Sequence, residues 1–471
     1  MSVFSLGFVE LKTMATQKAL QLPDILRCIF DWLLIVDEQS LHVVFKVNKT
    51  WFFNAVHFRW RSTNSGRIAG VPAERRWIYV PFIRTLELDD EIGKGLYYND
   101  ESFRQIVLTN LKAITTKWLQ DAQEDPVDVR DQTGNMKAFL PSSLEKLELL
   151  GFSISVSELQ HLMFTCPYLR FIHIEKARDG VTSQLFMDFL RGCPNLEVAI
   201  FGSEMSKLVT HETILYLASC HKLRHLDIPK VLTTDILERI QETRGGGFAT
   251  LEFLRAQVEA SAMTSLLRLF DHPHSHLRQI SLQVQGPPGQ HYSLQPLTMA
   301  PVQMDNIVLE FPQDIILSAD TLKVLRRFSR ARNVKIIATC GANIQCPDLT
   351  DADFAEIVKG MHELEVFELV GMECNLTVES LAALSHNCRS LKEVFLPPAF
   401  NFNFHSLANP SPFPENDVWF PWLASFGIGG FDPSPTPRHV PNISLFNRYC
   451  LFPLLFFFFF FCFVLCALKL T

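Results

Sequence analysis

The chain has 471 residues, 48% of them hydrophobic, and its formal net charge is −7 at pH 7. This length and hydrophobic content suit globular domains with a sizeable core or a long repeat array. The negative charge disfavours a basic footprint over a whole domain, so the sequence predicts no nucleic-acid partner. Eleven cysteines, with no secretory signal in the N-terminal extension of residues 1–20, indicate reduced thiols in the cytoplasm or nucleus.

The first predicted unit is a helical module over residues 21–61. Pro23 suits the first turn of a helix, and apolar residues recur at helical spacing from Leu22 onward. A second helix is predicted to open at Asp37. A module of about 40 residues is marginal for independent folding, so its apolar residues form either its own core or a docking surface.

This module resembles the F-box family. It has the Leu-Pro opening, Ile29 and Leu33 in the first helix and Leu41 in the second. The segment "VNKTW" matches the family's Val-x-Lys-x-Trp, and Trp60 follows near the end. One departure is Asn48, where the family often has Cys or Ser.

The resemblance implies docking on a Skp-type adaptor, which links F-box proteins to a cullin-RING ubiquitin ligase. An aliphatic patch at the Leu-Pro end agrees with an interface in which a helix enters a groove. Trp51 and Trp60 are expected in the module's own core. Carried over by position, the adaptor-binding residues are Leu22, Pro23, Ile25, Leu26 and Ile29.

Residues 62–142 are expected to connect the module to a repeat array, with irregular first repeats, and the array itself covers residues 143–400. The pattern Cys-x-x-Leu-x-x-apolar-x-apolar begins at Cys166, Cys193 and Cys220, which are 27 residues apart. Its leucine position predicts strands near Leu144, Leu169, Leu196, Leu223, Leu251, Leu277, Leu364 and Leu391, with weaker copies at Met304 and Val334. Helical periodicity predicts helices over residues 157–164, 183–190, 211–218, 234–241, 319–328, 351–358 and 378–385.

A fixed period of this size indicates a solenoid, in which each repeat buries its apolar face against its neighbours. The repeat of strand, loop and helix resembles the leucine-rich-repeat family, in its cysteine-containing subfamily. Together with the first module, the chain resembles a divergent F-box leucine-rich-repeat protein of the fungal type. The expected fold class is α/β: a leucine-rich-repeat solenoid with parallel strands inside and helices outside, preceded by a small all-α F-box module.

Two regularities within the repeats favour packing over chemistry. The cysteines at 166, 193, 220 and 388 sit where a small buried group fits, and a solenoid separates them too widely for a shared metal. The residue after each strand leucine alternates in charge, which favours in-register stacking in a parallel sheet and is interpreted as a solvated ladder. The ladder residues are Glu145, Arg170, Glu197, Arg224, Glu252, Arg278, Asp305, Lys335, Glu365 and Lys392.

The resemblance also implies that the repeats hold a protein substrate. Side chains between the buried strand positions face the concave side, and their mixed chemistry suits either a binding hot spot or ordinary edge packing. The candidate substrate-binding residues are Phe171, His173, Val198, Ile200, His225, Asp227, Phe253 and Arg255. We find no catalytic, cofactor-binding or metal-binding motif, so a non-catalytic adaptor subunit of a ubiquitin ligase is expected.

A basic stretch in the later repeats is interpreted as a solvated helix face in preference to a site for an acidic partner. Its residues are Lys323, Arg326, Arg327, Arg330, Arg332 and Lys335.

The C-terminal part departs from the repeats. Residues 401–449 are rich in Pro and Phe without a period, and residues 450–468 are apolar and long enough to span a bilayer. The phenylalanine run at 456–461 is typical of translated noncoding sequence, which we favour over a tail anchor. A membrane partner would depend on residues 450–468 alone. The alternative functions are therefore a Skp-bound or a membrane-anchored repeat scaffold without ligase function.

Overall fold

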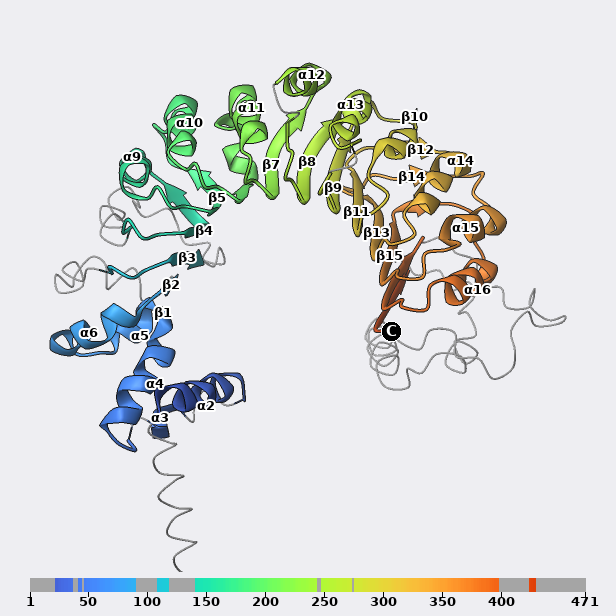
Figure 1. The fold of residues 1–471 in the computed structure, drawn as a ribbon. Coiled ribbons are helices and arrows are strands. Elements are labelled where there is room, and N and C mark those ends of the chain that lie inside the picture. Colours follow the sequence, from blue (N-terminus) through green and yellow to red (C-terminus); the bar gives the residue numbers. More distant parts are fainter. Residues whose placement is uncertain are drawn as a thin grey trace, which may run out of the picture. The chain divides into compact units, whose positions relative to one another are not determined.

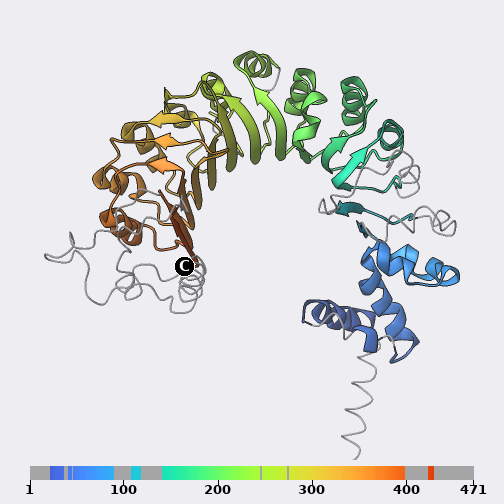
Figure 2. The same cartoon turned by 180° about the vertical axis from the view of Figure 1, so that it is seen from behind.

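The computed structural model describes residues 22–36, 41–44, 46–89, 108–117, 140–243, 247–272, 275–397 and 423–428. The chain divides into unit 1, Met1–Glu212, and unit 2, Thr213–Thr471. In each unit parallel strands form a sheet with helices on one face, and the other face is open (Figures 1 and 2). This arrangement confirms the predicted α/β fold class.

The N-terminal module contains α2 (Pro23–Val36), α3 (Leu41–Val44) and α4 (Lys49–Arg61). Asn48 caps α4, because its side-chain oxygen accepts a hydrogen bond from the Trp51 N–H at 2.9 Å. The core of the module consists of Leu26, Phe30, Val44 and Ala55, with Ile29, Leu33, Trp51 and Phe58 packed against it.

Both tryptophans expected in the interior are packed. The Trp51 ring meets Phe30 edge-on at 5.7 Å between centroids. The Trp60 ring stacks at 4.6 Å on Tyr79, which ends α6 (Ala73–Tyr79) beyond the module.

Unit 1 carries a parallel sheet that begins directly after the module. Successive strands are in register, for example Ile172 opposite Ala199, and the buried residues of each strand alternate with partly exposed ones. Its strands are β1 (Ser62–Asn64), β2 (Thr85–Asp89), β3 (Ala113–Lys117), β4 (Lys146–Ile154), β5 (Phe171–Ala177) and β6 (Val198–Phe201). Its other elements are α5 (Ser65–Ala69), η2 (Val80–Phe82), α9 (Val156–Thr165), α10 (Ser183–Arg191) and η5 (Ser203–Lys207).

Unit 2 continues the same strand-and-helix repeat. Its main strands are β7 (His225–Leu232), β8 (Phe253–Glu259), β9 (Gln279–Gln285), β11 (Asn306–Phe311), β13 (Asn333–Ala338), β15 (Val366–Val370), β17 (Glu393–Leu396) and β18 (Ser425–Ile428). The helices are α11 (His211–Ser219), in which the division falls, α12 (Thr234–Glu242), η6 (Ala260–Ala262), α13 (Met263–Arg268), η7 (Gln295–Met299), α14 (Ala319–Leu322), η8 (Lys323–Arg327), α15 (Asp351–Val358) and α16 (Val378–Asn387).

The repeat in β13 has a different register from the predicted one. Asn333 pairs with Asn306 and Val334 with Ile307, so the position equivalent to Met304 is Ala331, and Val334 is the next buried residue. Ala331 is 0% exposed. The ladder residue is therefore Arg332, which replaces Lys335 and preserves the alternation of charge.

One strand was not predicted within residues 401–449. Strand β18 pairs parallel with β17, and the Ala424 N–H donates to the Lys392 carbonyl as in the preceding repeats. The sequence carries the signal, because Leu423, Phe426 and Ile428 repeat the spacing of three and five residues.

A smaller parallel sheet in unit 2 was also not predicted from the sequence. It has the order β10 (Gln290–Tyr292), β12 (Ile315–Leu317), β14 (Ile344–Gln345) and β16 (Met372–Glu373). Strands of two or three residues are too short to show an alternating hydrophobic pattern.

Candidate functional site

The outer side of α2 carries an apolar stripe. Leu22 is 54% exposed, Ile25 38% and Trp32 59%, and Pro23 is exposed beside them. Steps of three and four residues place Leu22, Ile25, Ile29 and Trp32 along one side of the helix, and we call these four residues the α2 stripe. Sequence reasoning missed Trp32, although its spacing from Ile25 and Ile29 is that of one helix face.

Leu26, which we expected to bind the adaptor, belongs to the module's core. It is 0% exposed and clusters with Phe30 and Ala55. One residue beyond Ile25, the helix turns by about 100°, which points the Leu26 side chain inward. Ile29 is partly buried and packs against the same cluster. The expectation for Leu26 is therefore wrong.

The open face of unit 1 brings four of the candidate substrate-binding residues together. On β5 and β6, Phe171 pairs with Val198 and His173 with Ile200. All four are half-buried, and they alternate with fully buried residues such as Ile172. The structure therefore places them on the predicted face, as a largely apolar surface two strands wide.

Charged side chains from β4 border this apolar surface. The Lys146 ammonium lies 4.5 Å from the centroid of the Phe171 ring and 2.8 Å from the Glu148 carboxylate. His173 Nδ1 is 3.6 Å from Glu148 Oε1. Burial alone would raise the pKa of Glu148, but hydrogen bonds from Lys146 and Thr115 bring it below its usual value. Glu148 is thus an ionised carboxylate, held in place by Lys146 and Thr115, at the border of the apolar surface.

The open face of unit 2 holds the other four candidates. On β7 and β8, His225 pairs with Phe253 and Asp227 with Arg255. The His225 and Phe253 rings stack with centroids 4.0 Å apart and planes 13° from parallel. Arg255 Nη1 lies 3.9 Å from Asp227 Oδ2. The surface thus combines a flat aromatic platform with a pair of opposite charges.

The state of the imidazole follows from its surroundings. Burial lowers the pKa of His225 below 6.5, so the ring is neutral at pH 7. A neutral ring can stack on Phe253 without the cost of desolvating a charge. The platform therefore offers a partner an apolar contact area edged by the ring nitrogens of His225, one a donor and the other an acceptor.

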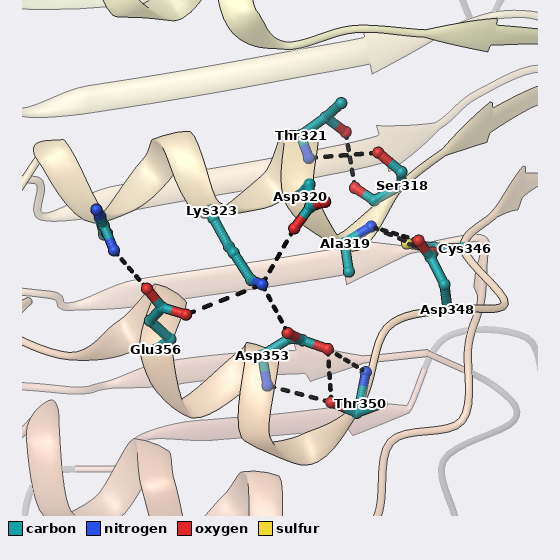
Figure 3. Close-up of polar contacts among 11 residues, drawn as sticks. Ser318, Ala319, Asp320, Thr321, Lys323, Cys346, Asp348, Thr350, Asp353 and Glu356 are labelled. Atoms are coloured by element: carbon teal, nitrogen blue, oxygen red, sulfur yellow. Dashed lines mark hydrogen bonds and ion pairs between the residues drawn. The ribbon is translucent and has the colours of Figure 1, made fainter.

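The basic stretch of unit 2 is matched by the chain's own carboxylates. Lys323 Nζ lies 2.8 Å from Asp353 and 3.1 Å from Asp320, and Arg326 pairs with Glu356 (Figure 3). Hydrogen bonds from Lys323 and Thr350 lower the pKa of Asp353 to about 2. These contacts join η8 to α15, which supports the interpretation as a solvated helix face.

The ladder charges also pair within each unit. In unit 1 Arg170 Nη2 lies 2.6 Å from Glu197 Oε1, and in unit 2 Arg224 lies 3.5 Å from Glu252. The Arg side chains are more than half exposed. Exposed pairs contribute roughly 0–1 kcal/mol each. The ladder therefore aligns neighbouring strands and adds little stability per pair.

Neither a family model nor a curated protein matches the sequence. Solved structures with a similar fold include an internalin from Listeria monocytogenes, with 13% identity, a TM-score of 0.38, and 76% of this chain and 88% of that chain covered. The yeast complex of Rad7 and Elc1 has 10% identity, a TM-score of 0.40, and 94% and 99% covered. The leucine-rich repeat-containing protein LegL7 from Legionella pneumophila has 11% identity, a TM-score of 0.28, and 78% and 97% covered.

The class of the protein follows from its own geometry. From β2 onward, a buried apolar residue, most often leucine, precedes each strand of the main sheet by two residues, and helices cover one sheet face in both units. The chain therefore has the architecture of a leucine-rich-repeat scaffold. None of the described helices is long and apolar enough to cross a membrane.

Proposed function

We propose that the chain is the substrate-recognition subunit of an SCF-type (Skp–cullin–F-box) E3 ubiquitin ligase. In this proposal the α2 stripe and Pro23 dock on a Skp-type adaptor, the adaptor joins a cullin, and the open sheet face binds a protein substrate. The chain contributes binding alone, without a catalytic group or cofactor of its own. The observation that carries the proposal is the exposure of Leu22, Ile25 and Trp32 on one side of α2.

The energetics of the module favour a docking role for this stripe. Leu26 and Phe30 already fill the core from the inner side of α2, so the exposed side chains are not needed to close it. Burying an apolar side chain of this size contributes about 1.5–3 kcal/mol. Three such side chains on one helix face therefore provide enough apolar surface for a stable helix-in-groove contact.

The substrate part of the proposal depends on the open face. The platform of His225 and Phe253, with Arg255 exposed beside it, has the aromatic and guanidinium chemistry that is enriched at protein interfaces. The unit 1 surface around Phe171 supplies apolar contacts. Both surfaces are proposed to contact protein.

The proposed location is the cytoplasm or nucleus, where ubiquitin ligases of this kind operate. Free cysteines in the described residues, among them the buried Cys166 and Cys388, suit a reducing compartment. Residues 450–468, the basis for the membrane-anchored alternative, lie outside the described residues.

Affinity purification from cells, with and without a proteasome inhibitor, tests the proposal. We expect a Skp-type adaptor and a cullin in both samples and enrichment of substrate when the proteasome is inhibited. Adaptor without cullin would support the scaffold alternative. Absence of both would refute the proposed function.

A further inference from the structure

A cavity of about 1070 Å³ lies at the carboxyl-terminal ends of strands β8, β9 and β11 in unit 2. Its walls come from residues 259–264, from residues between 284 and 299, which include β10, and from residues 311–313. None of the candidate substrate-binding residues lines it. The cavity is therefore separate from the platform on β7 and β8.

One wall of the cavity is an edge strand. Among the described residues, β10 is the first strand of the smaller sheet and pairs with β12 alone. Ile315 of β12 donates its N–H to the Asn343 carbonyl, 3.0 Å away on the β14 side. Hydrogen-bonding groups alternate sides along a parallel strand, so those of Ile316 point toward β10. Its pairing partner His291 accordingly turns its own N–H and C=O away from β12.

The cavity adjoins this unpaired edge. Residues 290–292 of β10 and residues 259–261, where β8 ends, both line it. The space beside β10 is therefore the place that a further strand would take. Its volume is just above the roughly 300–1,000 Å³ of small-molecule sites, which suits a short segment of polypeptide.

Buried, tightly packed side chains form the apolar part of the lining, which we call the floor of the cavity. Tyr292, Leu294 and Phe311 are buried, and the Tyr292 hydroxyl donates to the Pro287 carbonyl at 3.3 Å. Gly286 leaves room for that hydroxyl, since a Cβ there would lie 1.9 Å from the Tyr292 oxygen. Such a floor can receive the alternate side chains of an extended peptide.

The polar part of the lining is rich in amides and contains a carboxylate. Gln285, Gln290, Gln295 and Gln313 are among the lining residues. The Gln285 amide donates to the Gln257 side chain at 2.9 Å and the Gln313 amide to the Val284 carbonyl at 2.9 Å, which leaves Gln290 and Gln295 as the amides for a ligand with peptide groups. Glu259 provides the one carboxylate, and no Lys or Arg is among the described lining residues. A phosphate or carboxylate ligand would find neither Lys nor Arg among these residues, whereas a Lys or Arg would find Glu259.

We propose that this cavity binds an extended peptide of a protein partner, which adds as a strand to the free edge of β10 and places a Lys or Arg at Glu259. Backbone hydrogen bonds to His291 supply affinity, and the floor and Glu259 supply specificity. Peptide binding at β10 does not depend on the proposed ligase function. Only the identification of this peptide as part of the ligase substrate rests on that function.

The test is a selection of random decapeptides, displayed on phage, against the full-length protein. We expect the enriched peptides to carry Lys or Arg and to bind in fluorescence-anisotropy titrations. Glu259→Gln should weaken binding about tenfold or more, the scale of a hydrogen bond to a charged group. Glu238→Gln, an exposed glutamate on α12, should leave binding unchanged.

A pair of variants at one position separates backbone from side chain. His291→Pro removes the edge N–H and should weaken binding about tenfold or more, while His291→Ala, which keeps the N–H, should bind nearly as well as wild type. Proline is tolerated on edge strands. If circular dichroism shows that His291→Pro does not fold, N-methylation of single peptide bonds in the decapeptide tests the same hydrogen bonds.

Several results would overturn the inference: no enriched peptide, enrichment of acidic peptides, or equal binding by His291→Pro and His291→Ala. Capture of a Skp-type adaptor is measured on the same preparations. Peptide binding without adaptor capture would refute the proposed function alone, and adaptor capture without peptide binding would refute this inference alone.

Discussion

The repeat cysteines Cys166 and Cys388 are held as protonated thiols by their surroundings. Cys166 and Cys193 are buried, and their sulfurs lie 3.3 Å from the Pro141 carbonyl and 3.4 Å from the Phe189 carbonyl. Burial raises the pKa of Cys166 and of Cys388 to about 12. Burial of Cys166, Cys193 and Cys388 agrees with the packing role predicted from their position before each strand, whereas Cys220 is half-buried. Because reactivity requires the thiolate, Cys166 and Cys388 should be unreactive at neutral pH.

This environment predicts a pattern of alkylation. At pH 8 iodoacetamide should modify the exposed Cys28 and Cys340 and leave Cys166 and Cys388 unmodified, as read by peptide mass spectrometry. Protection should persist above pH 9, where an ordinary thiol ionises, because the folded pKa is raised. Unfolding in urea is the control and should expose every thiol. Rapid modification of native Cys166 at pH 8 would contradict this account.

Neighbouring residues on α2 are predicted to differ sharply in their effect on stability. Leu26→Ala removes a fully buried side chain and should cost about 2–5 kcal/mol. Ile25→Ala, on the exposed side, should change stability by about 0.5 kcal/mol or less. Hydrogen exchange of α2 and α4 amides measures both. Equal loss of protection in the two variants would mean that the inner and outer sides of α2 are assigned wrongly.

At the scale of elements, Asn48, the position that departs from the F-box resemblance, caps helix α4. The family's Ser and this chain's Asn can both cap a helix through a side-chain oxygen. Asn48→Ala should therefore destabilise the start of α4 by about 1 kcal/mol, whereas Asn48→Ser should be close to neutral. Exchange rates of the first-turn amides, including Trp51, report the difference. Faster exchange in the Ser variant than in the Ala variant would exclude the capping role.

The elements were largely predictable because each repeat must bury one leucine-type side chain at a fixed place. Helix α15 spans the predicted residues 351–358. The register at β13 was misread because Ala331 replaces the leucine, and the pattern then began at Val334, the next buried position. Strand β18 was missed because its spacing from Leu391 is longer than the period.

The candidate sites were less predictable than the elements. Alternation along β5 to β8 correctly placed residues such as Phe253 on the open face. Helical spacing did not decide whether Leu26 faces the core or the solvent, because apolar residues occur on both sides of α2 and their spacing does not show which side meets the core. The edge of β10 depends on hydrogen bonding between segments distant in sequence, which no local pattern reveals.

At the scale of the whole molecule, substrate capture is predicted to depend on the open face and not on the helices. Phe253→Ala with Arg255→Ala should lower substrate affinity on the order of thirtyfold, the cost of a hot-spot truncation of 2 kcal/mol or more, with adaptor binding unchanged. The control is Phe164→Ala, an 80% exposed residue on α9. Comparative purification with proteasome inhibition measures the effect. Loss of substrate in the control variant alone would move the binding surface to the helices.

The most direct test of the ligase assignment is co-precipitation of the Skp-type adaptor and cullin with a variant that carries Leu22→Ala and Pro23→Ala together. Both residues are exposed at the outer end of α2, so the change should abolish capture of adaptor and cullin while the circular dichroism spectrum stays unchanged. Trp51→Ala is the folding control, because truncating a packed Trp costs about 3–5 kcal/mol and should unfold the module. The account predicts capture by wild type and none by the double variant. Full capture by the double variant, or none by wild type, would contradict it.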